Sequence, residues 1–168
     1  MNLLFINNGK GRFKEEALFK GVGFNGDGLA EAGMGTDMGD INRDGWLDIF
    51  VTNFSGETNT LYLNNKSGFF TDASIKTGLG KPSIPFLAFG TKFIDFNLDG
   101  WLDVYVANGH VIDNINLINK QYQHAQYNQI YINQGNGFFL DKTIEINGDV
   151  MQLSVSRGAA FGDIDNDG

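Results

Sequence analysis

The sequence contains DINRDGWLD at Asp40–Asp48 and DFNLDGWLD at Asp95–Asp103, and a third copy begins as DIDNDG at Asp163–Gly168. Each whole copy has oxygen-bearing side chains at positions 1, 3, 5 and 9 and a glycine at position 6. The glycine permits the positive φ with which a loop wraps around one point, and alternate side chains then converge on that point. Calcium takes about six to eight oxygen ligands and tolerates irregular geometry better than magnesium does. The pattern therefore predicts calcium binding.

The predicted ligands offer a side-chain oxygen or, at position 7, a backbone carbonyl. In the first loop they are Asp40, Asn42, Asp44, Trp46 and Asp48, and in the second they are Asp95, Asn97, Asp99, Trp101 and Asp103. The third copy contributes Asp163, Asp165 and Asp167 but lacks positions 7 and 9 in this sequence, so we expect it to bind weakly or not at all.

Two alternatives compete with this interpretation. An EF-hand takes a glutamate at position 12 and lies between helices, but position 12 here is Val51 or Val106. The residues after the loops, 46–52 and 101–106, are rich in β-branched and aromatic types, which predicts strands. Turn chemistry alone explains a single Asp-Gly pair such as Asp27-Gly28. Because five ligand positions recur in register, we favour calcium for the two whole loops.

Composition excludes several classes of function. The 168 residues have a formal net charge of −8, and nine of the 20 acidic residues lie in the three loops, so the rest of the chain is close to neutral. Without a basic stripe to neutralise phosphates, a nucleic-acid partner is not expected. No apolar run approaches the roughly 20 residues that span a bilayer. The hydrophobic content of 42% is enough for one domain with a buried core.

The loops lie inside a longer repeat. A glycine precedes the first aspartate of each loop by five residues, at Gly35, Gly90 and Gly158. A second block recurs as LFINNGKGRF at 4–13, LYLNNKSGFF at 61–70 and IYINQGNGFF at 130–139, and its form predicts a hairpin. Each repeat then contains four antiparallel strands, as a propeller blade does. We predict an all-β fold of four-stranded antiparallel β-propeller blades with calcium-binding loops between strands.

The chain resembles FG-GAP/VCBS-repeat proteins, and within them the group related to cartilage acidic protein, which often has an ASPIC/UnbV domain downstream. The stretches that support this resemblance are VTNFSGETNTLYLNN at 51–65, VANGHV at 106–111 and SRGAAFGDIDNDG at 156–168. The resemblance implies an integrin-α-like propeller of about seven blades with calcium in its loops. It also implies an exported protein, extracellular, periplasmic or on the cell surface, without an established catalytic activity.

The repeat boundaries divide the chain into one propeller segment with four parts. We expect a partial blade at 1–16, whole blades at 33–73 and 86–144, and a partial blade at 154–168. Because two whole blades cannot close a ring, we expect an incomplete propeller from a longer protein, with its N-terminus and any signal peptide outside this sequence.

Three function hypotheses follow. We expect a calcium-stabilised propeller segment that binds an extracellular protein or a glycan without catalysis. The alternatives are a polysaccharide lyase or hydrolase segment and a purely structural repeat. His110 and His124 have no metal-type or triad-type spacing, and we expect the rings of Trp46 and Trp101 to pack between blades. The polar stretch Asn114–Gln129 predicts a long surface loop, where binding residues often lie.

Overall fold

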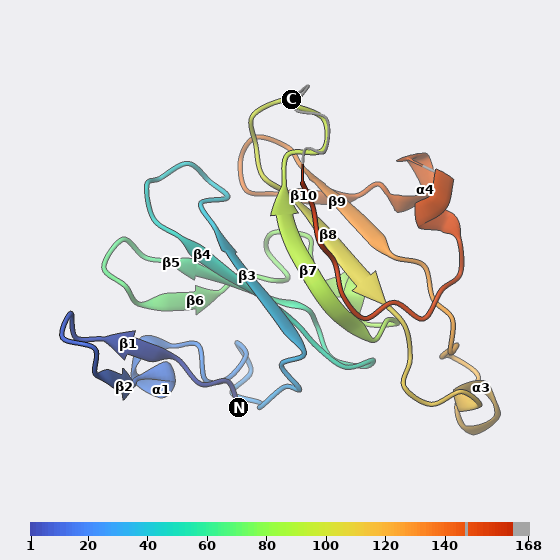
Figure 1. The fold of residues 1–168 in the computed structure, drawn as a ribbon, viewed down its shortest axis with the longest axis horizontal. Coiled ribbons are helices and arrows are strands. Elements are labelled where there is room, and N and C mark those ends of the chain that lie inside the picture. The colour runs from blue at the N-terminus through green and yellow to red at the C-terminus, as the bar shows by residue number, and fades with distance from the viewer. Residues whose placement is uncertain (147, 163–168) are drawn as a thin grey trace.

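The computed structural model describes residues 1–146 and 148–162, which form a hairpin followed by two four-stranded antiparallel sheets (Figure 1). The predicted all-β class and the four-stranded blade architecture are confirmed. In each sheet the strands pair in chain order, so each sheet is a simple meander. No helix in the described residues has the length and apolar character that crossing a bilayer needs.

The strands match the recurring blocks of the sequence. The hairpin is β1 (Phe5–Asn7) and β2 (Phe13–Glu15). The first sheet is β3 (Gly35–Gly39), β4 (Asp48–Thr52), β5 (Thr60–Asn64) and β6 (Phe70–Asp72). The second sheet is β7 (Ala88–Ile94), β8 (Asp103–Asn108), β9 (Gln129–Asn133) and β10 (Phe139–Asp141). Short helices are α1 (Ala17–Lys20), α2 (Gly80–Ser83), α3 (Ile115–Ile118), α4 (Thr143–Ile146) and the 3₁₀ helix η1 (Gly148–Met151).

The strand that follows each loop is buried on both faces. All five residues of β4 are buried, and β8 is buried at five of its six positions. Their β-branched and aromatic side chains suit a strand that is covered on both sides by neighbouring units. The main apolar core lies between the two sheets and includes Phe50, Phe93 and Tyr131. A second cluster around Val51 and Tyr62 packs between the first sheet and the hairpin region.

The glycine that precedes each loop allows neighbouring inner strands to approach closely. A Cβ atom added at Gly35 would lie 2.2 Å from the carbonyl oxygen of Phe89 on β7. At Gly90 it would lie 2.7 Å from the backbone nitrogen of Ala159. Real Cβ atoms do not approach other atoms so closely, so only glycine fits at these positions. The structure thus gives the physical reason for a recurrence that the sequence shows without explaining.

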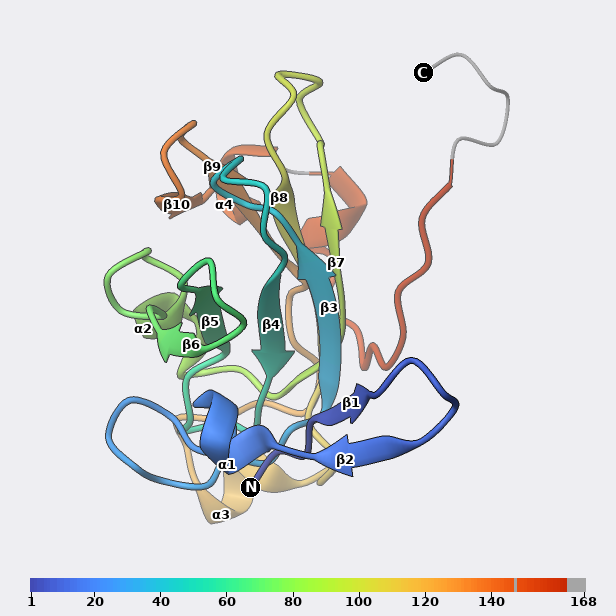
Figure 2. The same cartoon turned by 90° about the vertical axis from the view of Figure 1, so that its left-hand side faces the viewer.

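The described C-terminal segment runs along the outer face of the second sheet (Figure 2). The Gly90 N–H donates to the Arg157 carbonyl at 3.0 Å, and the Ser156 N–H donates to the Asn108 carbonyl at 3.0 Å. The Arg157 guanidinium lies 4.4 Å from the centroid of the Phe89 ring. Residues 156–162, to which no strand is assigned, therefore lie against β7 and the end of β8.

A third recurring block was not predicted from the sequence. After the last strand of each unit, a carboxylate accepts the N–H of the residue two positions on, which starts a helical turn. The distances are 2.7 Å for Glu15 and Ala17, 2.9 Å for Asp72 and Ser74, and 3.0 Å for Asp141 and Thr143. The turn then ends at a glycine with positive φ, which is Gly21, Gly78 or Gly148.

The stretch Asn114–Gln129 is only partly the surface loop that its composition predicts. It contains α3, whose Leu117 is 79% exposed. Its end is packed, however, because the Gln126 side chain is buried and its Oε1 accepts the Leu87 N–H at 3.0 Å. Backbone bonds between Gln126 and Ser154 also attach this stretch to the C-terminal segment.

Candidate metal sites

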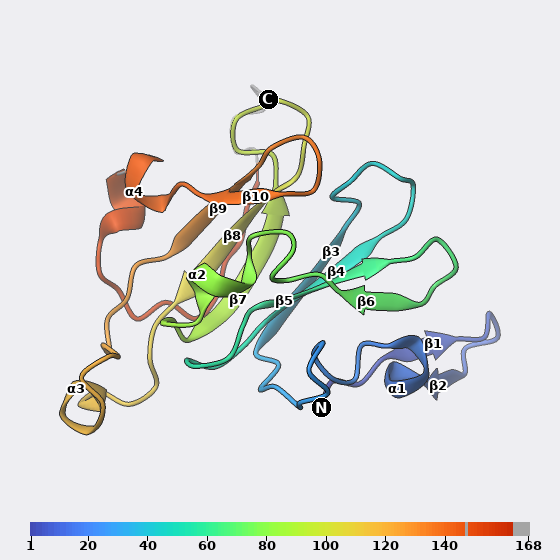
Figure 3. The same cartoon turned by 180° about the vertical axis from the view of Figure 1, so that it is seen from behind.

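The two whole aspartate loops occupy equivalent places in the two sheets. Residues 40–47 connect β3 to β4, and residues 95–102 connect β7 to β8. Both loops project from the same end of the molecule, away from α3 (Figure 3). The third copy, with Asp163, Asp165 and Asp167, lies outside the described residues.

In the first loop the carboxylates at positions 1 and 5 turn inward onto the backbone. Asp40 accepts the N–H of Asp44 at 3.0 Å through one oxygen and the N–H of Gly45 at 2.8 Å through the other. The Asn42 side-chain oxygen Oδ1 accepts the Asp44 N–H at 3.1 Å, and the Asp44 carboxylate accepts the Trp46 N–H at 3.0 Å. Side-chain oxygens from positions 1, 3 and 5 therefore surround one short stretch of backbone.

The second loop repeats this hydrogen-bond pattern. Asp95 accepts the N–H groups of Asp99 and Gly100 at 3.1 and 2.7 Å, and Asp99 accepts that of Trp101 at 2.8 Å. Asn97 accepts the Asp99 N–H at 3.1 Å. The glycines at position 6 have φ of +88° and +87°. The two loops therefore adopt the same backbone geometry, although positions 2 and 4 differ in sequence.

The aspartate at position 9 connects its loop to the third strand of its sheet. Asp48 accepts the Ile41 N–H at 3.3 Å and the Asn64 N–H, on β5, at 2.9 Å. In the second sheet the equivalent acceptor is Asp103, whose donors are Phe96 at 2.9 Å and Asn133 at 2.8 Å. Both carboxylates are fully buried. Their oxygens hold the loop and two strands together independently of any ion.

Burial makes these two carboxylates hard to ionise. Desolvation raises the pKa of Asp48 from 3.8 to about 6, and the nearby charges of Asp44 and Asp40 add to the increase. The two backbone N–H bonds oppose it. Desolvation likewise raises the pKa of Asp103, and its neighbours Asp99 and Asp95 contribute in the same direction. A nearby cation would relieve both effects.

The two tryptophans at position 7 differ in environment. Trp46 is 42% exposed, so the prediction that its ring packs between blades stays a prediction. Trp101 is half-buried, and the Arg43 guanidinium of the first loop lies 4.3 Å from the centroid of its ring. Arg43 also donates to the Gly100 carbonyl. The first loop thus contacts the second directly, a contact that sequence spacing could not reveal.

The donor set of each loop suits a hard cation. Within the described residues, no cluster of three or more acidic or imidazole side chains is arranged for a metal ion. In each loop the first aspartate also accepts backbone N–H groups of its own loop. A carboxylate has about four lone-pair sites on its two oxygens, so accepting an N–H leaves capacity for a metal. The residues therefore fit calcium by type, number and spacing.

The histidines form no candidate catalytic site. His110 is buried, its Nδ1 accepts the Ile112 N–H at 3.0 Å, and its ring packs against Phe54 and Tyr122. Burial lowers its pKa. The His110 N–H donates to the His124 carbonyl at 2.8 Å, which places both histidines in the connection after β8.

Comparison with known families identifies the repeat. The family described as FG-GAP-like repeat matches residues 40–106 and again residues 95–168. The chain belongs to the FG-GAP-like repeat family. Both matches begin at the first aspartate of a loop. Curated proteins, in contrast, gave no match to the chain.

Proposed function

We propose that this FG-GAP-like chain is a calcium-binding β-propeller segment that mediates binding to a protein or a glycan without catalysis. The observation that carries the proposal is that two loops with the same ligand-type residues fold with the same hydrogen bonds. A turn that needed only tightness would not require oxygen-bearing side chains at positions 1, 3, 5 and 9 in both copies.

In the first site the ion would be held by Asp40, Asn42 and Asp44, the Trp46 carbonyl, and Asp48. In the second it would be held by Asp95, Asn97 and Asp99, the Trp101 carbonyl, and Asp103. Bound calcium would supply positive charge to a cluster of carboxylates, two of which are fully buried. The ligand residues themselves would fix the ends of three strands in each sheet, because each loop joins two strands and its last aspartate bonds to a third.

A binding role is favoured over catalysis because the acidic side chains already accept hydrogen bonds from the backbone. The aspartates best placed for chemistry are engaged with loop and strand backbone, and the ring of His110 lies among aromatic side chains. The resemblance to the group related to cartilage acidic protein supports the finer parts of the proposal. These are an exported location and an extracellular partner.

Calorimetric titration of the folded chain with calcium tests the proposal. We expect two sites with dissociation constants on the order of 10⁻⁴ to 10⁻³ M, as in extracellular calcium modules. Zinc should give little heat, because neither loop offers nitrogen or sulfur ligands. A folded protein that gives no calcium signal would refute the proposal. Glycan-array binding separates the binding role from the two alternatives, and a polysaccharide-turnover assay identifies the enzymatic one.

A further inference from the structure

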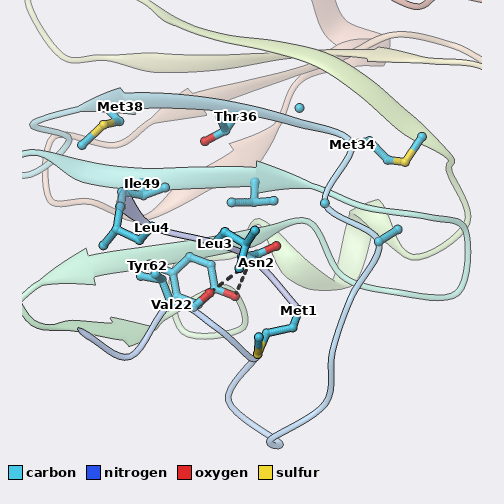
Figure 4. A pocket seen from close by; sticks show the side chains of 14 residues that line it. Met1, Asn2, Leu3, Leu4, Val22, Met34, Thr36, Met38, Ile49 and Tyr62 are labelled. Carbon is cyan, nitrogen blue, oxygen red and sulfur yellow. Dashed lines mark hydrogen bonds between the residues drawn. The ribbon is translucent and has the colours of Figure 1, made fainter. Parts of the chain in front are cut away.

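Apolar and charged side chains lie in different parts of the first sheet. None of the described side chains that line the pocket beside β3 and β4 is charged, and Leu4, Met38 and Ile49 are typical of them (Figure 4). A lysine and a loop carboxylate meet elsewhere, where the turn between β5 and β6 lies beside the first aspartate loop. That turn is therefore a neighbour of any ion bound in the loop.

The turn between β5 and β6 is fixed to the first loop by Asn64. The Asn64 N–H donates to the Asp48 carboxylate at 2.9 Å, and its Nδ2 donates to the Leu47 carbonyl at 3.2 Å. Its side-chain oxygen Oδ1 accepts the Lys66 N–H at 3.0 Å. One residue thus joins the end of the loop to the start of the turn, and so determines where the backbone of Lys66 lies.

Lys66 occupies a turn position that suits glycine. The equivalent residues of the hairpins β1–β2 and β9–β10 are Gly9 and Gly135. The value of φ is +78° at both glycines and +68° at Lys66. A lysine in this left-handed region costs free energy that glycine does not, because its Cβ atom crowds the following carbonyl oxygen. Strain that is kept in one repeat and absent from the others indicates a use for the side chain.

The Lys66 side chain reaches the first loop. Its Nζ lies 3.8 Å from Oδ2 of Asp44, the predicted ligand at position 5. The other ion pairs among the described residues involve no predicted ligand. In the second loop the same oxygen, Oδ2 of Asp99, accepts Nδ2 of Asn97 at 2.8 Å, and Gly135 has no side chain to offer. The carboxylate at position 5 thus has a cationic partner in the first loop and a neutral partner in the second.

We propose that Lys66 competes with calcium for Asp44 and thereby lowers the calcium affinity of the first loop. The inference rests on the calcium binding proposed above. The ammonium neutralises part of the negative charge of the loop, and calcium has to displace it. Losing an exposed ion pair changes an equilibrium constant by about 1.5- to fivefold. Arg43 contacts the second loop through the Gly100 carbonyl rather than a carboxylate, so it does not compete in this way. Residue 66 therefore sets the affinity of one loop without changing its ligands.

Calcium calorimetry at low ionic strength tests the inference in chains that also carry Asp99→Ala, so that the heat comes from the first loop. Lys66→Gln removes the charge but keeps the Cβ atom, whereas Lys66→Gly also removes the backbone strain. Both should tighten binding by the same factor, about 1.5- to fivefold, and added salt should reduce the difference from the parent. Lys66→Arg, which keeps a cation, should bind calcium as the parent does.

Lys10→Gln is the matched control, because Lys10 is exposed in the first hairpin and its loss should leave the affinity unchanged. If Asp99→Ala fails to fold by circular dichroism, the intact second loop is kept, and Lys66→Gln should then change one of the two dissociation constants and not the other.

Two results overturn the inference alone. One is calcium binding by Lys66→Gln with the affinity of the parent. The other is tighter binding by Lys66→Gly and not by Lys66→Gln, since backbone strain and not charge would then be the cause. A folded parent chain that binds no calcium refutes the proposed function itself, and this inference with it.

Discussion

The buried Asp48 carboxyl gives a prediction that needs no metal, since it concerns the chelated protein. Folding raises the pKa of this group from 3.8 to about 6, so the folded state holds a proton more tightly than the unfolded state does. The contribution of this tighter proton binding to the stability of the folded state is fully present below about pH 4 and is lost as pH rises toward about 6. With 1.36 kcal/mol per pH unit, the loss is about 3 kcal/mol.

Urea denaturation of the parent chain and of Asp48→Asn in chelator measures this loss. Every other titrating group is shared, so the difference in free energy of unfolding isolates Asp48. Asparagine also loses one of the two N–H bonds, but that contribution does not depend on pH. We expect the parent's stability relative to the variant to fall by about 3 kcal/mol between about pH 4 and pH 7.

A difference that stays flat with pH, or that grows as pH rises, would refute this reasoning. It would mean that the bonds from Ile41 and Asn64 outweigh the cost of burial. Asp103→Asn offers an independent repeat, because desolvation raises the pKa of Asp103 as well. Its difference should slope in the same direction.

Three further predictions concern single side chains. Asp44→Asn keeps an oxygen for the Trp46 N–H but loses its charge, so it should lower thermal stability in calcium and not in chelator. The control Asp27→Asn, in an exposed turn, should leave thermal stability unchanged both in calcium and in chelator. Arg43→Ala removes an exposed cation–π contact worth about 0.5–1 kcal/mol, so urea denaturation in chelator should show the free energy of unfolding lowered by about that amount. Because burial lowers the pKa of His110, its protonation in the unfolded state should reduce stability as pH falls below about 6.5, and His110→Gln should lack this dependence.

The strand order could be predicted because its signals are local and repeated. A loop with glycine at position 6, a β-branched strand and a glycine-containing hairpin turn each specify their own backbone conformation. Two near-copies in register then imply the same sheet twice, which is what β3–β6 and β7–β10 form. The glycine five residues before each loop was visible in the sequence, but its reason was not. At Gly35 that reason is the carbonyl of Phe89 on the neighbouring strand, and at Gly90 it is the backbone of Gly158 and Ala159.

The double role of the position-9 aspartates could not be predicted in the same way. The position was identified as a ligand from its place in the loop. Its second bond depends on Asn64, sixteen residues further on, because that is where β5 returns beside β4. The contact of Arg43 with Trp101 is less local still, because it joins two repeats. Sequence spacing gives the contents of one loop, whereas tertiary contacts decide what each loop touches.

The placement of Asp48 and Asp103 also suggests why acidic residues gather at the loops of an otherwise nearly neutral chain. A fully buried carboxylate is costly unless it is compensated, and two backbone N–H groups compensate it only in part, as the raised pKa shows. In our proposal calcium supplies the remaining charge. Because Asp48 joins the loop to β5 as well as to β4, an ion that fixes Asp48 acts on several strands at once. Calcium should then stabilise each sheet as a cooperative unit, and its removal should increase hydrogen exchange in β5 and β9 as well as in the loops.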